Sequence, residues 1–255
     1  MKGWQIFVHS LRQVTGNFEA ALRVSGLLYV AQTVVGLLLL GGVAMRGGGP
    51  AGMMQSGFTS GMALGFLIVM LVTLVTGLWI AVGWHRYVLL GEAPTTVPTF
   101  RSDRIMAYFL RSLGYGAILI LLAVVWGGFV GFAIGSIVSD SMTLAIILMA
   151  ILIYLPILVI GFRITADLPA AAIGVDKPFL SGWAATVGQS VDLIVLALVV
   201  IVILGGLGLI GGYVFGASSV LYAIWAFVFG WFQMMVGVSI LTTLYGHYIE
   251  KRPLV

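Results

Sequence analysis

Four side chains at the ends of apolar segments have types that bind phosphate: His85, Arg86, Arg163 and His247. A guanidinium group and a protonated imidazole both donate hydrogen bonds to anionic oxygens. If the four side chains meet, they predict a contact site for a lipid headgroup or a nucleotide phosphate. The alternative is that Arg86 and its aromatic neighbours only anchor a helix at the membrane surface.

The chain shows no pattern typical of a catalytic or metal centre. Its three histidines, His9, His85 and His247, lack ligand spacing, and there is no cysteine. A phosphate-binding Walker loop, a nucleophile elbow and a paired-histidine zinc motif are also missing from the sequence. We therefore predict no catalytic residue, no metal ion and no cofactor.

Glycine and proline residues mark places where helices pack or bend. Two glycine strips have a spacing of four residues: Gly127, Gly131 and Gly135, then Gly208, Gly212 and Gly216. Small residues at this spacing let helix backbones approach closely, so we expect helix packing there, with oligomerisation or a conduction path as alternatives. Pro156 lacks an N–H group, so it predicts a kink in its helix.

The composition requires a membrane as the solvent for most of this chain. Of 255 residues, 61% are hydrophobic and 8% are charged, whereas a soluble domain carries about 25% charged residues. The apolar runs, such as Ala117–Val125, do not alternate with polar residues, which excludes a transmembrane β-barrel pattern. Six runs approach or exceed the ~20 residues that span a bilayer as a helix: about Gly26–Val43, Gly61–Trp84, Gly114–Val138, Met142–Phe162, Val191–Phe215 and Val220–Tyr245.

The basic residues predict the orientation of these spans. Every lysine and arginine except Arg46 falls in 1–25, 85–113, 163–190 or 246–255, which lie on one side of the membrane. The positive-inside rule places that side, with both termini, in the cytoplasm. The net charge of +4 therefore reflects membrane topology, and we expect no nucleic-acid partner.

The lengths of the connections divide the chain into three helical hairpins. We predict an all-α polytopic membrane bundle forming one integral-membrane domain over residues 1–255, with hairpins at 26–86, 104–163 and 180–248. The two long cytoplasmic connectors each read as a break followed by an amphipathic helix. Residues 1–25 precede the first hairpin, and apolar residues recur at helical spacing from Trp4 to Leu22. We expect that segment to be an interfacial helix at headgroup level.

Ionisable residues are scarce inside the predicted spans. Asp192 comes nearest to the membrane interior. Ion-coupled transporters depend on buried charges along their pathways. The pattern therefore disfavours a proton- or sodium-coupled transporter, and leaves uncharged or lipidic substrates open.

Two short runs resemble elements of a known group of proteins. Gly83-Trp84-His85-Arg86-Tyr87-Val88-Leu89-Leu90-Gly91-Glu92 and Leu241-Thr242-Thr243-Leu244-Tyr245-Gly246-His247-Tyr248-Ile249-Glu250 resemble segments of uncharacterised bacterial six-span inner-membrane proteins, chiefly alphaproteobacterial. The layout is similar to membrane domains of glycerophosphodiester phosphodiesterases and to YciC-like proteins. The resemblance implies a bacterial inner-membrane location and no established activity. The chain has no phosphodiesterase catalytic domain.

These features together predict a non-enzymatic, multi-pass inner-membrane protein that serves as an accessory, assembly or scaffold subunit. The expected partners are membrane lipids and either a larger membrane complex or further copies of the chain. The alternative is a transporter or lipid-handling protein for a small or lipidic substrate. A third reading, a membrane enzyme acting at the headgroup level, would use His85, Arg86 and His247.

Overall fold

The computed structural model describes residues 2–45, 60–138, 141–216 and 219–254. In these ranges the chain is helical, without strands. The elements are α1 (Lys2–Thr15), α2 (Phe18–Met45), α4 (Ser60–Leu90), α5 (Ser102–Ile137), α6 (Met142–Met149), η1 (Ala150–Tyr154), α7 (Leu155–Thr165), α8 (Leu168–Ile173), α9 (Ser181–Ala185), α10 (Ser190–Val200), η2 (Ile201–Gly205), α11 (Gly206–Phe215), α12 (Val220–Leu244) and η3 (Tyr245–Ile249). The three η segments are π-helical turns within longer helices. Arg46 lies outside the described residues.

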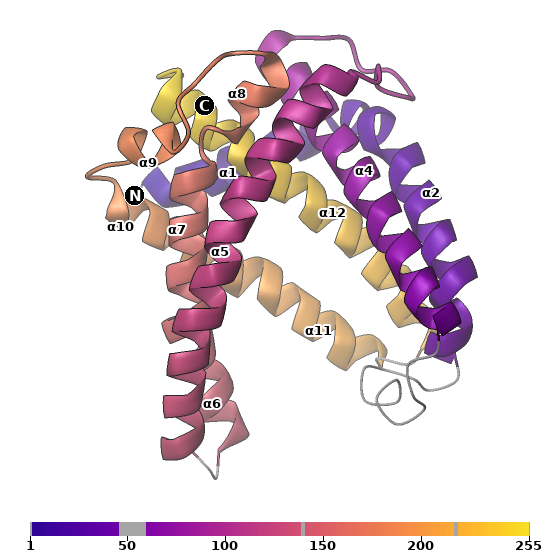
Figure 1. The fold of residues 1–255 in the computed structure, drawn as a ribbon, viewed down its shortest axis with the longest axis vertical. Helices are drawn as coiled ribbons and strands as arrows, with labels where there is room; N and C mark the ends of the chain where they lie inside the picture. The colour runs from indigo at the N-terminus through magenta and orange to yellow at the C-terminus, as the bar shows by residue number, and fades with distance from the viewer. Residues whose placement is uncertain (1, 46–59, 139–140, 217–218, 255) are drawn as a thin grey trace.

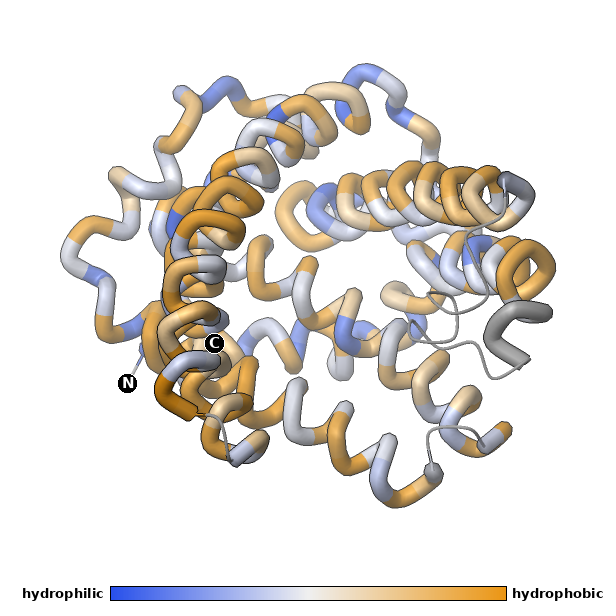
Figure 2. The backbone as a smooth tube through the Cα atoms, turned by 60° about the horizontal axis from the view of Figure 1, so that its bottom comes forward, coloured by the Kyte–Doolittle hydropathy of each residue, from blue (hydrophilic) through white to orange (hydrophobic). Residues whose placement is uncertain are grey.

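Six helical segments are long and apolar enough to cross a membrane, which confirms the predicted all-α membrane bundle. Their residues are hydrophobic on all sides over much of their length (Figure 2). The segments are Phe18–Gly41, Ser60–Leu90, Ser102–Ile137, Met142–Ile173, Ser190–Phe215 and Val220–Ile249. The third segment begins earlier than the apolar run because the amphipathic connector helix continues directly into the span as α5.

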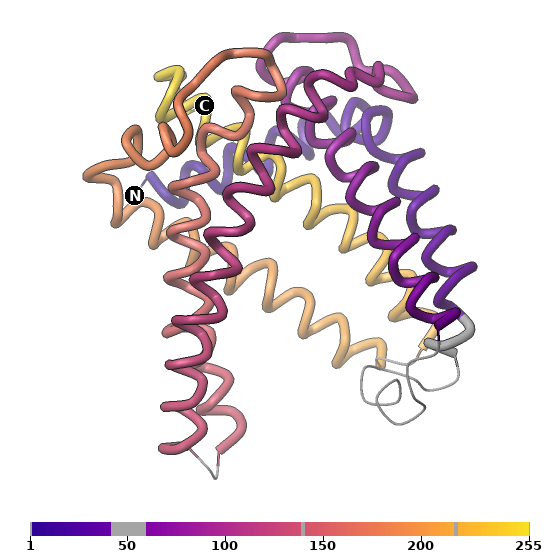
Figure 3. The backbone as a smooth tube through the Cα atoms, viewed as in Figure 1, coloured from indigo at the N-terminus to yellow at the C-terminus, as the bar shows by residue number. Residues whose placement is uncertain are grey.

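Consecutive spans pack in pairs. α2 packs against α4, α5 against α6, η1 and α7, and α11 against α12. The pair α5–α7 and the pair α2–α4 are close together at the end of the molecule that carries both termini, and they diverge away from it (Figures 1 and 3). We call the end with the termini the basic face, because Arg86, Arg101, Arg104 and Arg163 lie there.

The hydrophobic core joins the first and the last elements of the chain near the basic face. It includes Ile6 of α1, Trp84 of α4, Leu193 of α10 and Met235 of α12, each fully buried. These side chains come from both ends of the sequence, so elements near the N-terminus and elements near the C-terminus share one core.

Helix α1 packs into this core. It contacts α10 and α12, and it buries Ile6, Phe7, Ser10 and Val14. Gly3 permits this approach, because a Cβ atom there would lie 2.1 Å from the Asp192 carbonyl oxygen. The amphipathic pattern predicted a helix, and α1 is one. Part of its apolar side is buried in the core, Trp4 is 49% exposed, and a place at headgroup level stays a prediction.

The fourth span contains a π-helical turn directly before Pro156. Proline has no N–H to donate to the carbonyl four residues earlier, which is that of Leu152. The indole Nε1 of Trp126, on α5, donates to this carbonyl oxygen at 2.8 Å. Within the turn the Leu155 N–H bonds five residues back to Ala150. The π-helical turn η1 precedes the proline, and the kink that the sequence predicts at Pro156 stays a prediction.

Candidate functional site at the basic face

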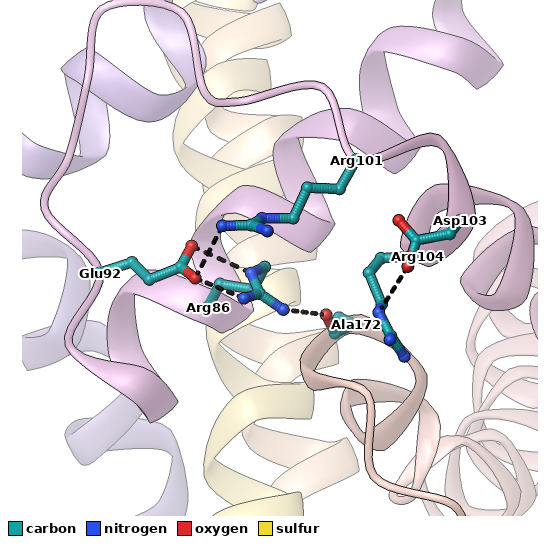
Figure 4. A network of polar contacts seen from close by, with 6 residues as sticks. All are labelled: Arg86, Glu92, Arg101, Asp103, Arg104 and Ala172. Atoms are coloured by element: carbon teal, nitrogen blue, oxygen red, sulfur yellow. Dashed lines mark hydrogen bonds and ion pairs between the residues drawn. The ribbon is translucent and has the colours of Figure 1, made fainter.

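Arg86 is the centre of a polar network that joins three elements (Figure 4). It extends from α4, and its Nε donates to Glu92 Oε2 at 3.0 Å, while a second nitrogen pairs with Glu92 Oε1. Its Nη1 donates to the carbonyl oxygen of Ala172 in α8 at 3.0 Å. Arg101 also reaches Glu92 Oε1, at 3.2 Å. One carboxylate thus holds two arginines where α4, the following connector and α8 meet.

Local backbone geometry brings Glu92 back to Arg86. Helix α4 ends at Leu90, and Gly91 takes a positive φ of 69° that turns the chain. Glycine adopts this conformation without steric cost. The connector is then tied to α4 again, because the Trp79 Nε1 donates to the Pro98 carbonyl oxygen at 2.9 Å.

The arginines change the acid–base behaviour of Glu92. The hydrogen bond from Arg86, and then the charges of Arg86 and Arg101, lower the pKa of this carboxyl group below its ordinary value. Partial burial acts in the opposite direction and is the weaker influence overall. Glu92 is therefore held as a carboxylate at neutral pH.

His85 takes no part in the surface of the basic face. Its ring is fully buried, with Nδ1 2.8 Å from Thr242 Oγ1 and Nε2 3.2 Å from Tyr108 Oη. These contacts join α4 to α12 and α5. Both ring nitrogens already bond within the protein, so the structure gives no support to a headgroup contact through His85.

Arg163 and His247 each have separate partners. Arg163 Nη2 donates to Ser190 Oγ at 2.6 Å, and its guanidinium lies 5.1 Å from the centre of the Trp183 ring. His247 Nδ1 lies 3.1 Å from the carbonyl oxygen of Arg252. The contacts found for His85, Arg86, Arg163 and His247 do not bring them together as one phosphate site. Arg86, Arg163 and His247 remain individual candidates for headgroup contact.

A buried carboxylate that sequence reasoning overlooked lies beside this network. Asp167, between α7 and α8, is fully buried. Its Oδ1 accepts from Tyr115 Oη at 2.6 Å, and its Oδ2 accepts from Ser181 Oγ at 2.7 Å and the Gly182 N–H at 3.2 Å. These three hydrogen bonds to one side chain join α9 to α5. Asp167 is the one charged residue in the largely apolar stretch from 164 to 173, and this isolation is the sequence feature that could have indicated a buried carboxylate.

The two glycine strips behave differently. On α5, a Cβ at Gly127 would meet Ile153 at 3.3 Å, so this glycine allows close packing, but Gly131 and Gly135 have nothing within 4 Å. On α11, Gly208 and Gly212 would make ordinary contacts with α12 side chains, and Gly216 has a positive φ of 71° that suits the helix end. The tightest approach is at Gly211, where the Trp225 indole lies.

The described ranges contain no group of three or more His, Asp or Glu residues placed to hold a metal ion. No family model, curated protein or solved structure matches this chain.

Proposed function

We propose that this chain is a non-enzymatic protein of the bacterial inner membrane that acts as an accessory, assembly or scaffold subunit of a larger membrane complex. The observation that carries the proposal is the uncovered outer half of the α5–α6 hairpin. Within the most apolar stretch of Met142–Ile173, 6% of residues are buried, against 33% for Val220–Ile249. The hairpin extends away from the rest of the bundle (Figure 3).

The exposed surface of this hairpin suits a partner helix. Phe129 and Phe132 are 71% and 81% exposed, and they provide large aromatic surfaces. Beside them, Gly131 and Gly135 form a face on which a Cβ atom would meet nothing within 4 Å. In lipid, helices associate through close van der Waals contact at small residues, so an open glycine face on a hairpin with exposed aromatic rings supports association with another transmembrane helix.

The basic face supports a non-enzymatic role. The polar groups of Arg86, Arg163 and Asp167 contact neighbouring elements of the chain itself. They tie connectors to spans, which is a structural use of charge. Arg101 and Arg104 pair with Glu92 and Asp103, but 41% and 39% of their side chains are exposed, which supports additional contacts with lipid phosphates.

The test is purification of the tagged protein from native membranes in mild detergent, followed by native gel electrophoresis and identification of co-purifying chains. We expect the wild type to run as a complex larger than its 27.1 kDa chain. Gly131→Leu combined with Gly135→Leu should release the monomer, because two bulky side chains block the face. Gly61→Leu is the matched control, since Gly61 also has open space but lies on α4. A monomeric wild type would remove the proposal.

A further inference from the structure

A groove on the opposite side of the bundle from the α5–α6 hairpin lies between α2, α11 and α12. Its volume is about 520 Å³, within the range of roughly 300–1,000 Å³ typical of ligand pockets. Aromatic rings form most of its wall. Phe18 packs edge-on against Trp231 with 5.6 Å between ring centres, and Trp225 stacks on Phe229 at 5.1 Å.

The polar atoms of this wall are turned away from the groove or already bonded. Tyr29 Oη donates to the Phe227 carbonyl oxygen at 3.0 Å, and Trp231 Nε1 donates to Ser25 Oγ at 2.7 Å. The indole nitrogen of Trp225 lies against Gly211. The groove therefore presents hydrocarbon and aromatic surface, and a polar solute would lose its hydrogen bonds to water on entering.

The groove lies within the membrane-spanning segments, so lipid acyl chains are the hydrocarbon that can enter it. Its residues belong to Phe18–Gly41, Ser190–Phe215 and Val220–Ile249, three of the candidate membrane spans. Leu22, Val30 and Val228 at its rim are exposed, so the groove opens sideways. In a bilayer, the surrounding hydrocarbon at this depth consists of lipid acyl chains.

The guanidinium group of Arg23 lies near the end of the groove that is closest to the basic face. Phe18, which begins α2, also lines a polar cavity of about 370 Å³ shared with Asn17, Glu19 and Arg23. The Arg23 guanidinium pairs with Glu19 at 2.6 Å, and both side chains are largely exposed. Exposed ion pairs are weak because water screens them, so a lipid phosphate can replace Glu19 as the partner of Arg23.

We propose that this groove binds one glycerophospholipid, with an acyl chain along Gly26 and Tyr29 and the phosphate at Arg23. The aromatic wall provides the contact surface, and Arg23 supplies the complementary charge. The site does not involve the α5–α6 hairpin, so it is independent of the subunit role proposed above.

Gly26 offers a direct way to fill the groove. A Cβ atom there would meet only Leu22, at 4.0 Å, so Gly26→Leu adds a side chain without clashing with the backbone. The matched control is Gly237→Leu on α12, where a Cβ atom meets nothing within 4 Å, outside the groove lining. Size-exclusion chromatography after stepwise heating is the test of whether each variant is folded as stably as the wild type.

Native mass spectrometry of the protein released from bacterial membranes measures bound lipid. We expect a one-phospholipid adduct on the wild type and on Gly237→Leu, and its loss on Gly26→Leu. Arg23→Gln should weaken the adduct, so that it disappears at a lower collision energy. A wild type without the adduct, or a folded Gly26→Leu that keeps it, would overturn the proposal.

Photocrosslinking in intact membranes provides a second readout that does not require the lipid to survive detergent. A phospholipid with a diazirine on its acyl chain should label peptides containing residues 22–30 and 225–232 above the rest of the spans. Gly26→Leu should reduce that labelling to the level of other lipid-facing helices. Uniform labelling of all the spans in the wild type would contradict a defined site.

Discussion

At the scale of single residues, Asp167 is the side chain whose substitution we expect to reduce stability most clearly. Its carboxylate is fully buried and accepts hydrogen bonds from Tyr115, Ser181 and the Gly182 N–H. Asp167→Asn replaces one acceptor oxygen with an NH2 donor that must face one of these donors. We expect a loss of about 1–3 kcal/mol in stability, the cost of an unsatisfied buried polar group. Size-exclusion chromatography after stepwise heating in detergent measures the shift.

Two variants give this prediction its controls. Asp176→Asn changes an exposed acid in the same connector and should leave the melting temperature unchanged. Tyr115→Phe removes one of the three donors, and it should be non-additive with Asp167→Asn because both changes break the same bond. Additive effects of the two substitutions would contradict the hydrogen-bonded arrangement.

Glu92 makes stability depend on pH. Its folded pKa lies below the unfolded value of about 4.3, so its stabilising contribution is present in full above that pH and is lost as pH falls through the lowered pKa. Because Glu92 is 37% exposed, we expect at most about 1 kcal/mol. Glu92→Gln should lower the melting temperature at pH 7 and make it fall less steeply as the pH drops below that unfolded value.

The matched control for Glu92 is Glu19→Gln. Glu19 and Arg23 form a pair whose side chains are 79% and 53% exposed, so water screens the interaction. We expect this variant to melt close to the wild type at pH 7. An equal loss at Glu19 and Glu92 would show that the Arg86 network adds no stability of its own.

At the scale of elements, the π-helical turn before Pro156 depends on a bond from another helix. Trp126 donates a hydrogen bond to the carbonyl oxygen of Leu152, which Pro156 leaves without its usual N–H donor. We predict that Trp126→Phe lowers stability by about 1 kcal/mol, the usual net value of one such bond. In the Pro156→Ala background, the new N–H can bond to Leu152, so the same change should cost less. Chemical denaturation of the four variants in mixed micelles measures this coupling.

The first helix shows what an amphipathic pattern leaves undecided. Its spacing predicted a helix, and α1 is one. The pattern had an apolar stripe through Trp4 and Phe7, whereas the buried side also includes Gly3 and Ser10. Ser10 bonds to Thr243 near the other end of the chain. Lipid and a protein core both accept an apolar stripe, so only the distant partner decides which one covers it.

At the scale of the whole molecule, the spans were predictable and the polar contacts were not. A span is a local property, because about 20 apolar residues suffice to cross the bilayer. The environment of His85 depends on Thr242, which is 157 residues away, and that of Asp167 depends on Tyr115, which is 52 residues away. Such pairs leave no spacing in the sequence. The transporter alternative and the family resemblance remain predictions.

The orientation of the molecule is testable with reporter fusions. The distribution of arginine and lysine predicts that the C-terminus lies in the cytoplasm. A green fluorescent protein fused after Val255 should fluoresce, and alkaline phosphatase at the same place should be inactive. A fusion at Gly49, between the first two predicted spans in the sequence, should give the reverse pattern. Active phosphatase at the C-terminus would refute the orientation.

Because α1 packs against α10 and α12, it can reach its final position only after those two helices have been synthesised. Ser10 leaves the ribosome 233 residues before its partner Thr243. At about 5–20 residues per second, the first helix waits roughly 10–50 s before its binding surface exists. During that interval its apolar face has only lipid, a chaperone or the insertion machinery to cover it. Helix α1 is therefore made before the helices that it packs against.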